Sequence, residues 1–195
     1  CAPPSGKAEQ HAGRPFVEVE RCGGCGKCTM VCPQAAMTVV EGRARLNPEH
    51  CVGCGDCMRS CPTEAIEFDW TTEIRPFLER LCEYALGAVL DKPGRVGYIN
   101  FLLGITPDCD CVPWSDAPIV PDIGILASTD PVAIDRASID LVNSQRGFAQ
   151  TALARNHAPG EDKFMGVWDY TDADYQISYA ARIGLGDASY RLIEV

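Results

Sequence analysis

The run Cys22-Gly-Gly-Cys25-Gly-Lys-Cys28-Thr-Met-Val-Cys32-Pro33 decides the architecture of the first half of the chain. The same arrangement returns 29 residues later as Cys51-Val-Gly-Cys54-Gly-Asp-Cys57-Met-Arg-Ser-Cys61-Pro62. Both runs have the spacing C-x2-C-x2-C-x3-C-P, which is typical of chains that hold two [4Fe–4S] clusters. An internal repeat of this length, present twice, predicts a pseudo-symmetric unit rather than a solenoid.

The spacing also predicts which cysteines act together. Three thiolates within seven residues can hold one face of a cluster, while the fourth, followed by proline, points away and ligates the other cluster. The first cysteine set is therefore Cys22, Cys25, Cys28 and Cys61. The second cysteine set is Cys51, Cys54, Cys57 and Cys32. A pair of zinc sites is the alternative, but zinc ribbons use paired C-x2-C units rather than four-cysteine runs.

Twelve of the 195 residues are cysteine, and eight of these lie in the two runs. A disulfide framework is another explanation, and it suits small secreted chains. Here the 71–195 region is long enough for a core of its own and holds few cysteines. The pattern therefore indicates metal chemistry in a reducing compartment, and we expect a cytoplasmic protein.

The chain is acidic, with 17 basic and 27 acidic residues and a net charge of −10. Most of the excess lies in the 71–195 region, which has 10 basic and 18 acidic residues. This balance excludes nucleic acid as a main partner, because phosphate binding needs basic clusters. It favours a redox partner with a basic docking patch. No apolar run reaches the roughly 18 residues of a membrane-spanning helix, so no membrane span is expected.

The chain begins with Cys1 rather than methionine, in a polar stretch that contains Pro and Gly. A fragment, a processed chain and a lipoprotein with a lipidated cysteine are three explanations for this start. We favour the fragment. Residues 1–15 are then a remnant of a preceding domain or a linker.

The remaining pattern predicts an α+β chain: a ferredoxin-type two-cluster domain over 16–70, then an α/β layered domain over 71–195. Amphipathic spacing predicts a helix that is capped by Thr71 or Thr72 and ends before Pro93-Gly94. Asp130-Pro131 predicts the start of another helix, which reaches about Asn143. A further helix is expected over 173–183, ended by Gly184. Strands are expected over 16–20, 37–40, 44–46, 65–68, 96–105, 119–127 and 190–195, of which 96–105 is expected to be buried.

Residues 16–70 resemble a bacterial two-cluster ferredoxin domain, which implies low-potential transfer of single electrons. The second half also resembles a known family, through stretches such as Gly97-Tyr-Ile-Asn, Ile105-Thr-Pro-Asp-Cys-Asp-Cys and Asp130-Pro-Val-Ala-Ile-Asp. This is an uncharacterised prokaryotic iron–sulfur family in which a ferredoxin module is inserted in a larger domain of unknown function. The resemblance implies that the chain is the C-terminal part of such a protein and that the 71–195 region lacks partner strands.

A third metal site is a further hypothesis. Cys109 and Cys111 alternate in a loop, so both sulfurs can point to one spot, and Cys1 and His11 are candidates to reach it. Such a Cys/His set suits zinc or mononuclear iron, with free thiols as the alternative. Cys82, on the apolar face of a predicted helix, is expected to be a core residue. Nearby aspartates are candidates for acid and base chemistry or, more simply, for turn and cap roles: Asp108, Asp110, Asp116, Asp122, Asp130 and Asp135.

Three hypotheses about function follow. The first is an electron-transfer protein that passes single electrons to or from a partner. The second is an oxidoreductase subunit in which the clusters feed a metal or substrate site near Cys109 and Cys111. In the third, the clusters only hold the loops in place. The sequence leaves the electron donor, the electron acceptor and the oligomeric state open.

Overall fold

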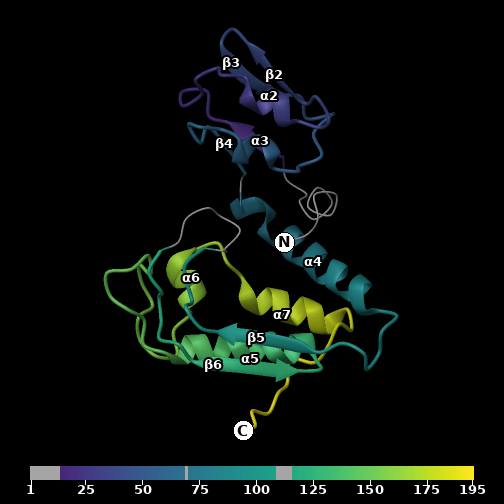
Figure 1. Cartoon of the computed structure of the whole chain (residues 1–195), viewed down its shortest axis with the longest axis vertical. Coiled ribbons are helices and arrows are strands. Elements are labelled where there is room, and N and C mark those ends of the chain that lie inside the picture. The colour runs from purple at the N-terminus through teal and green to yellow at the C-terminus, as the bar shows by residue number, and fades with distance from the viewer. Residues whose placement is uncertain (1–13, 69, 109–115) are drawn as a thin grey trace. The chain divides into compact units, whose positions relative to one another are not determined.

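The computed structural model describes residues 14–68, 70–108 and 116–195. The chain forms two compact units, Cys1–Arg80 and Leu81–Val195, and the boundary falls within the long helix α4 (Trp70–Val89). Helices and small antiparallel sheets build both units (Figure 1), so the α+β character is confirmed. The three predicted domains, 1–15, 16–70 and 71–195, stay predictions.

Two short antiparallel strand pairs organise the first unit. β1 (Phe16–Val17) pairs with β4 (Ile66–Glu67), and β2 (Met37–Val40) pairs with β3 (Arg43–Leu46). The second pair confirms the expected hairpin. Its turn places Glu41 at φ 52° and Gly42 at φ 73°, and two successive positive φ angles match the right-handed twist of the strands. The first strand is shorter than the expected 16–20, since the chain turns directly after it.

Two one-turn helices complete the first unit, α2 (Lys27–Val31) and α3 (Asp56–Arg59). Each begins directly after a glycine in the left-handed region, Gly26 at φ 75° and Gly55 at φ 80°. A residue with a Cβ is strained in that region, so the glycines allow a tight entry into each helix. The two helices occupy equivalent positions in the repeat, 29 residues apart.

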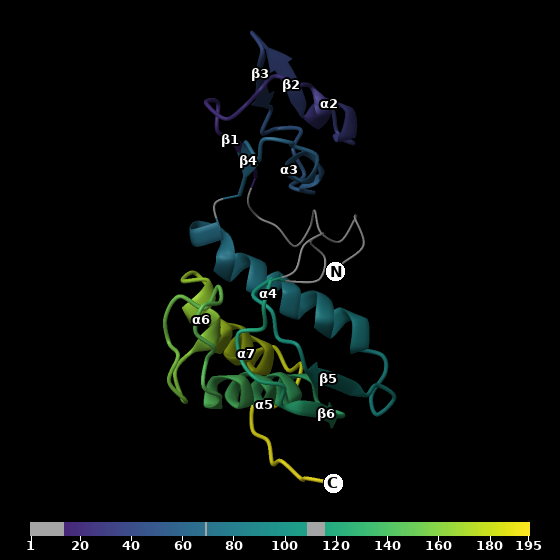
Figure 2. The same ribbon diagram turned by 60° about the vertical axis from the view of Figure 1, so that its left-hand side comes forward.

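The second unit contains one antiparallel pair, β5 (Tyr98–Leu102) and β6 (Gly124–Ser128), in register from Tyr98 opposite Ser128 to Leu102 opposite Gly124. Helix α5 (Pro131–Ser144) packs against both strands, as Figures 1 and 2 show from two sides. The sheet in the expected α/β layers thus has two strands among the described residues. Leu102 at the end of β5 and Val142 of α5 share one core cluster, completed by Ile119, Val120 and Leu153.

The outer face of this sheet is exposed. Ile99 is 61% exposed, Phe101 64% and Ile125 58%, while the alternate residues face α5. The expected buried strand over 96–105 is therefore wrong, because a pleated strand points successive side chains to opposite faces and only one face is covered by a described element. The expected strand over 119–127 begins later, at Gly124. Pro121 has no backbone N–H to continue a ladder, so the buried residues before it lie in a bend.

The helices of the second unit follow the expected caps in two cases. The Asp130 side chain accepts hydrogen bonds from the amides of Val132 and Ala133 over 2.9 and 3.0 Å, which confirms the start of α5. α7 (Ala173–Arg182) ends before Gly184 at φ 80°, as expected.

Two further expectations about helices and strands are wrong, and one helix was not expected. α4 begins at Trp70, so Thr71 and Thr72 lie within the helix and not at its cap. The short α6 (Lys163–Val167) was not expected. Residues 190–195 form no strand, because no described segment pairs with them. Within the described part of the chain, no helix is both long and apolar enough to cross a membrane.

Candidate metal centres

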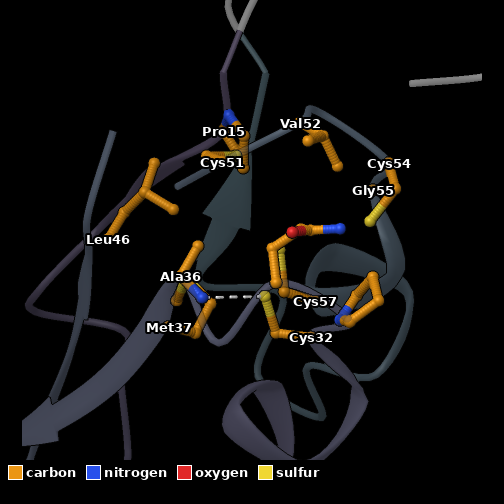
Figure 3. A pocket seen from close by; sticks show the side chains of 12 residues that line it. Pro15, Cys32, Ala36, Met37, Leu46, Cys51, Val52, Cys54, Gly55 and Cys57 are labelled. Carbon is orange, nitrogen blue, oxygen red and sulfur yellow. Dashed lines mark hydrogen bonds between the residues drawn. The ribbon is translucent and has the colours of Figure 1, made fainter. Parts of the chain in front are cut away.

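The second cysteine set comes together around one pocket of the first unit. Its lining includes all four predicted sulfur ligands, Cys51, Cys54 and Cys57 from the second run and Cys32 from the first. Figure 3 shows these side chains around the pocket, with Cys32 arriving from the end of α2 and Cys57 from α3. The pocket encloses about 310 Å³, its open mouth included.

The first cysteine set lines a second pocket of the same volume, about 310 Å³. Three of its cysteines, Cys22, Cys25 and Cys28, belong to the first run, and Cys61 belongs to the second. The last cysteine of each run therefore lies beside the first three cysteines of the other run. This exchange is what the crossed pairing of the sequence predicts.

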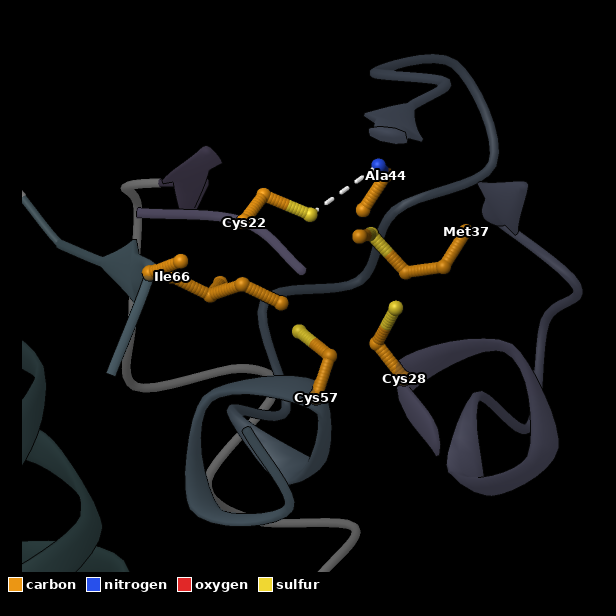
Figure 4. Close-up of a cluster of buried hydrophobic side chains, with 7 residues drawn as sticks. Cys22, Cys28, Met37, Ala44, Cys57 and Ile66 are labelled. Carbon is orange, nitrogen blue, oxygen red and sulfur yellow. Dashed lines mark hydrogen bonds between the residues drawn. The ribbon is translucent and has the colours of Figure 1, made fainter. Parts of the chain in front are cut away.

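A small apolar core lies between the two pockets and contributes to both. Met37 of β2 and Ile66 of β4 are 3% and 2% exposed, and they pack against the buried Cys22, Cys28 and Cys57. Figure 4 shows these cysteine side chains directed toward the two apolar residues. The core thereby fixes sulfurs of both sets in one packed unit.

The backbone repeats its conformation as closely as the sequence repeats its cysteines. Gly24 and Gly53 have φ angles of 66° and 69°. Ala35 and Glu64, which follow the two prolines, have φ angles of 49° and 50°. Left-handed geometry is uncommon for residues with a Cβ, so its recurrence at a spacing of 29 residues indicates that both halves build the same loop.

Backbone amides are directed at four of the sulfurs. The amide of Ala36 donates to Cys32 Sγ over 3.2 Å, and the amide of Ala65 donates to Cys61 Sγ over 3.3 Å, at equivalent positions of the repeat. Cys22 Sγ accepts from the Ala44 amide over 3.3 Å, and Cys51 Sγ accepts from the Gly53 amide over 3.4 Å. Donors at these positions stabilise thiolates, which are the form that binds metal.

In each of the two cysteine sets, a buried thiol has a raised pKa. Burial, with smaller effects from the neighbouring Cys54, Cys51 and Cys32, raises the pKa of the Cys57 thiol to about 12. Burial also raises the pKa of Cys28, with Cys22 and Cys25 adding to the effect. Without a positive ion these thiols stay protonated at neutral pH, so a metal must displace protons when it binds.

The pKa of Cys61 shifts in the opposite direction to that of Cys28 in the same set. Burial alone would raise the pKa of its thiol, but hydrogen bonds from the Thr63 hydroxyl and from the amides of Ala65, Thr63 and Glu64 outweigh that effect and lower it. The sulfur that crosses from the second run is therefore prepared for the thiolate form. Arg43, which the sequence analysis did not single out, donates to the Cys22 carbonyl oxygen at the same pocket.

The nine described cysteines are all free, which argues against a disulfide framework for that part of the chain. Within residues 14–68, 70–108 and 116–195, no three His, Cys, Asp or Glu side chains converge closely enough to hold one metal ion. The choice between two zinc sites and two [4Fe–4S] clusters stays a prediction.

The predicted third site lies outside the described residues, since Cys1, His11, Cys109 and Cys111 all fall in the undescribed segments. The third site stays a prediction. Cys82 is described and is 3% exposed in a core cluster with residues of α5 and α7, which confirms its structural role.

The described aspartates act mainly in the fold. Asp122 accepts from the Gly104 amide over 2.6 Å, and Asp130 caps α5. Asp135 lies within α5 and accepts from the Asn100 amide nitrogen over 3.0 Å. The simpler interpretation of these aspartates as turn and cap residues is confirmed for Asp122 and Asp130.

The sequence did not predict the buried charge of Lys163. Lys163 is fully buried, and its ammonium group donates to the carbonyl oxygens of Asn143, Ala158 and Glu161 over 3.2, 2.8 and 2.8 Å. A lysine in a polar loop gives no sequence signal of burial, because the three carbonyls that hold it are brought together only by the tertiary fold.

A family model described as "Domain of unknown function (DUF362)" matches residues 1–140 of the chain. No curated protein matches it. The matched range includes both four-cysteine runs and the first elements of the second unit.

Proposed function

The chain belongs to the DUF362 family, and we propose from its own residues that it is an electron-transfer protein that carries two [4Fe–4S] clusters. We assign residues 16–70 to the fold of the bacterial two-cluster ferredoxins. The observation that supports this most is the crossed pairing: each of two pockets is lined by the four cysteines of one predicted set. The spacing of the cysteines does not by itself group them in this way. The two halves must also fold around each other.

The residues fit the clusters in number, type and surroundings. Cys22, Cys25, Cys28 and Cys61 would hold one cluster, and Cys51, Cys54, Cys57 and Cys32 would hold the other. When bound, a [4Fe–4S] cluster takes up and releases single electrons, at a potential set by charge, hydrogen bonds to sulfur and exposure.

The chain's own residues set those conditions. Cys22, Cys28 and Cys57 are buried in the apolar core, which excludes water from that side of each site. Cys25 is exposed, so the pocket of the first cysteine set has one predicted ligand at the surface. That exposed edge is suited to electron exchange with a partner. The acidic surplus of the 71–195 region favours a partner with a basic docking patch.

An EPR-monitored potentiometric titration of the anaerobically purified chain tests this function. We expect two reversible one-electron reductions near about −400 mV, within the broad range of such clusters. Clusters that resist reversible reduction would serve only to hold the loops, and that result would contradict electron transfer.

The docking claim has a separate test. Electron transfer to a basic redox partner should slow as the salt concentration rises from about 10 mM to 0.5 M, because the Debye length falls from about 30 Å to a few Å. Rates that do not change over this range would contradict electrostatic docking while leaving the clusters themselves in place.

A further inference from the structure

An open pocket lies beside the loop that follows α5 in the second unit. Its walls are fixed by backbone hydrogen bonds: the Gly147 amide donates to the His157 carbonyl over 2.9 Å, and the Phe148 amide donates to the Ile119 carbonyl over 2.8 Å. The pocket has a volume of about 560 Å³, and sites for small molecules measure roughly 300–1,000 Å³. Its lining residues are Pro121, Arg146, Gly147, Phe148, Ala149 and His157.

The floor of this pocket rests on the core of the unit. Gly147 is buried, and a Cβ at its position would lie 2.3 Å from Leu153 Cδ2 and 3.2 Å from His157 Cα. Leu153 is only 2% exposed and belongs to the core cluster with Val120. An added Cβ would therefore press on the buried Leu153 side chain, so close packing shapes this part of the pocket.

The polar side chains of the pocket favour an anion. Arg146 and His157 are the lining residues with polar side chains, and no carboxylate is among the lining residues. Within the described part of the chain, neither of these two side chains takes part in an ion pair or hydrogen bond. By contrast, Arg136 is paired with Asp140 and Asp174.

Arg146 has no carboxylate partner among the described residues, although its unit is rich in carboxylates. Residues 81–195 contain 16 acidic and 8 basic side chains, so an arginine in this unit has many possible carboxylate partners. A guanidinium presents donors in a planar fork that matches a carboxylate or a phosphate. Phe148, which is 43% exposed, adds a flat apolar surface beside it, together with Pro121 and Ala149.

We propose that this pocket binds a small organic anion, with its carboxylate or phosphate head on Arg146 and its flat apolar body against Phe148. The His157 ring offers a second donor to the head group. An aromatic body would pack on the Phe148 ring in an offset or edge-to-face arrangement. The second unit thereby has a small-molecule site of its own, which does not depend on the proposed clusters.

Isothermal titration calorimetry on the anaerobically purified full chain tests the proposal, with benzoate and phenyl phosphate as probes. We expect at least one of them to bind at one site per chain with a dissociation constant of about 1 mM or lower. The probe that binds more tightly identifies the head group. Benzyl alcohol, which lacks the charge, and inorganic phosphate, which lacks the apolar body, should each bind at least about tenfold more weakly.

Two variants locate the site. Arg146→Gln should weaken binding of the better probe by about tenfold or more, because a charge-assisted hydrogen bond is lost. Arg191→Gln makes the same change of charge at an exposed arginine outside the pocket and should leave binding within about twofold. The proposal is overturned if neither anion binds at about 10 mM, if Arg146→Gln binds like the parent, or if either control compound binds as tightly as the better probe.

Discussion

Replacing Gly24 with alanine tests whether the loop of the first cysteine set is packed as closely as the structure has it. Gly24 has a φ of +66°, and a Cβ there would lie 2.2 Å from the carbonyl oxygen and 2.8 Å from the carbonyl carbon of Gly42. Real Cβ atoms essentially never come within 3.0 Å of another atom, so one of the two backbone turns must move by about 1 Å.

The magnitude follows from two costs. A residue with a Cβ in the left-handed region costs about 1–2 kcal/mol. Overpacking against a backbone that must shift costs a further 1–3 kcal/mol or so. We therefore expect Gly24→Ala to lower the free energy of unfolding by about 2–5 kcal/mol, measured by anaerobic urea denaturation. Because Gly24 lies between Cys22 and Cys25, the iron content should also fall, from about eight to about four atoms per chain.

Two other glycines of the same loop serve as matched controls. Gly26 has a φ of +75°, but its added Cβ would meet only Thr29 Oγ1 at 3.8 Å, so Gly26→Ala carries the conformational cost without the clash. Gly23 has no atom within 4 Å of an added Cβ and no positive φ, so Gly23→Ala should be close to neutral. If Gly24→Ala unfolds at the same urea concentration as Gly26→Ala and keeps its iron, the close approach of the two turns is wrong.

Further predictions concern crossed ligation and pH. Cys61→Ala should lose the iron of the first set and destabilise the 16–70 region, and retention of all the iron at parental stability would count against the crossed pairing. Burial raises the pKa of Asp135 in the folded chain above its value in the unfolded chain. The free energy of unfolding therefore falls as the pH rises and the buried carboxyl must ionise. Asp135→Asn should therefore raise the urea midpoint at about pH 7 and change it little at about pH 3. Hydrogen bonds from Arg136 and from the Tyr190 hydroxyl lower the pKa of Asp140. The Asp140 carboxylate therefore stabilises the fold above the pKa it has in the unfolded chain, and this stabilisation is lost as the pH falls through its pKa in the folded chain. Asp140→Asn should accordingly lower stability at about pH 7 by up to about 1 kcal/mol, and urea midpoints that shift in the same direction for both variants would refute the assignment.

The features that the sequence predicted correctly are set by local chemistry. The ligand sets of the cysteine runs stay a prediction, because the grouping of each set around one pocket depends on how the two runs fold together. The Glu41-Gly42 turn and the Asp130-Pro131 helix start are instead determined within a few residues. Each of these signals depends on the backbone conformation of a short segment, so tertiary packing leaves it unchanged.

The features that the sequence could not give depend on distant segments. The apolar composition of 96–105 is the same for a strand covered on two faces as for one covered on a single face, so the exposure of Phe101 had no signal. The five-residue α6 is too short for a periodic pattern, and its buried Lys163 is held by carbonyls of other segments. The pocket at Arg146 likewise joins residues from three separate parts of the chain.

The most direct test of the central claim is the content of iron, acid-labile sulfide and zinc in the anaerobically purified chain. Two [4Fe–4S] clusters on the two cysteine sets predict about eight iron atoms and about eight sulfides per chain, with no stoichiometric zinc. The protein should be brown, and reduction should produce an EPR signal. A colourless protein with stoichiometric zinc and no labile sulfide would contradict the account.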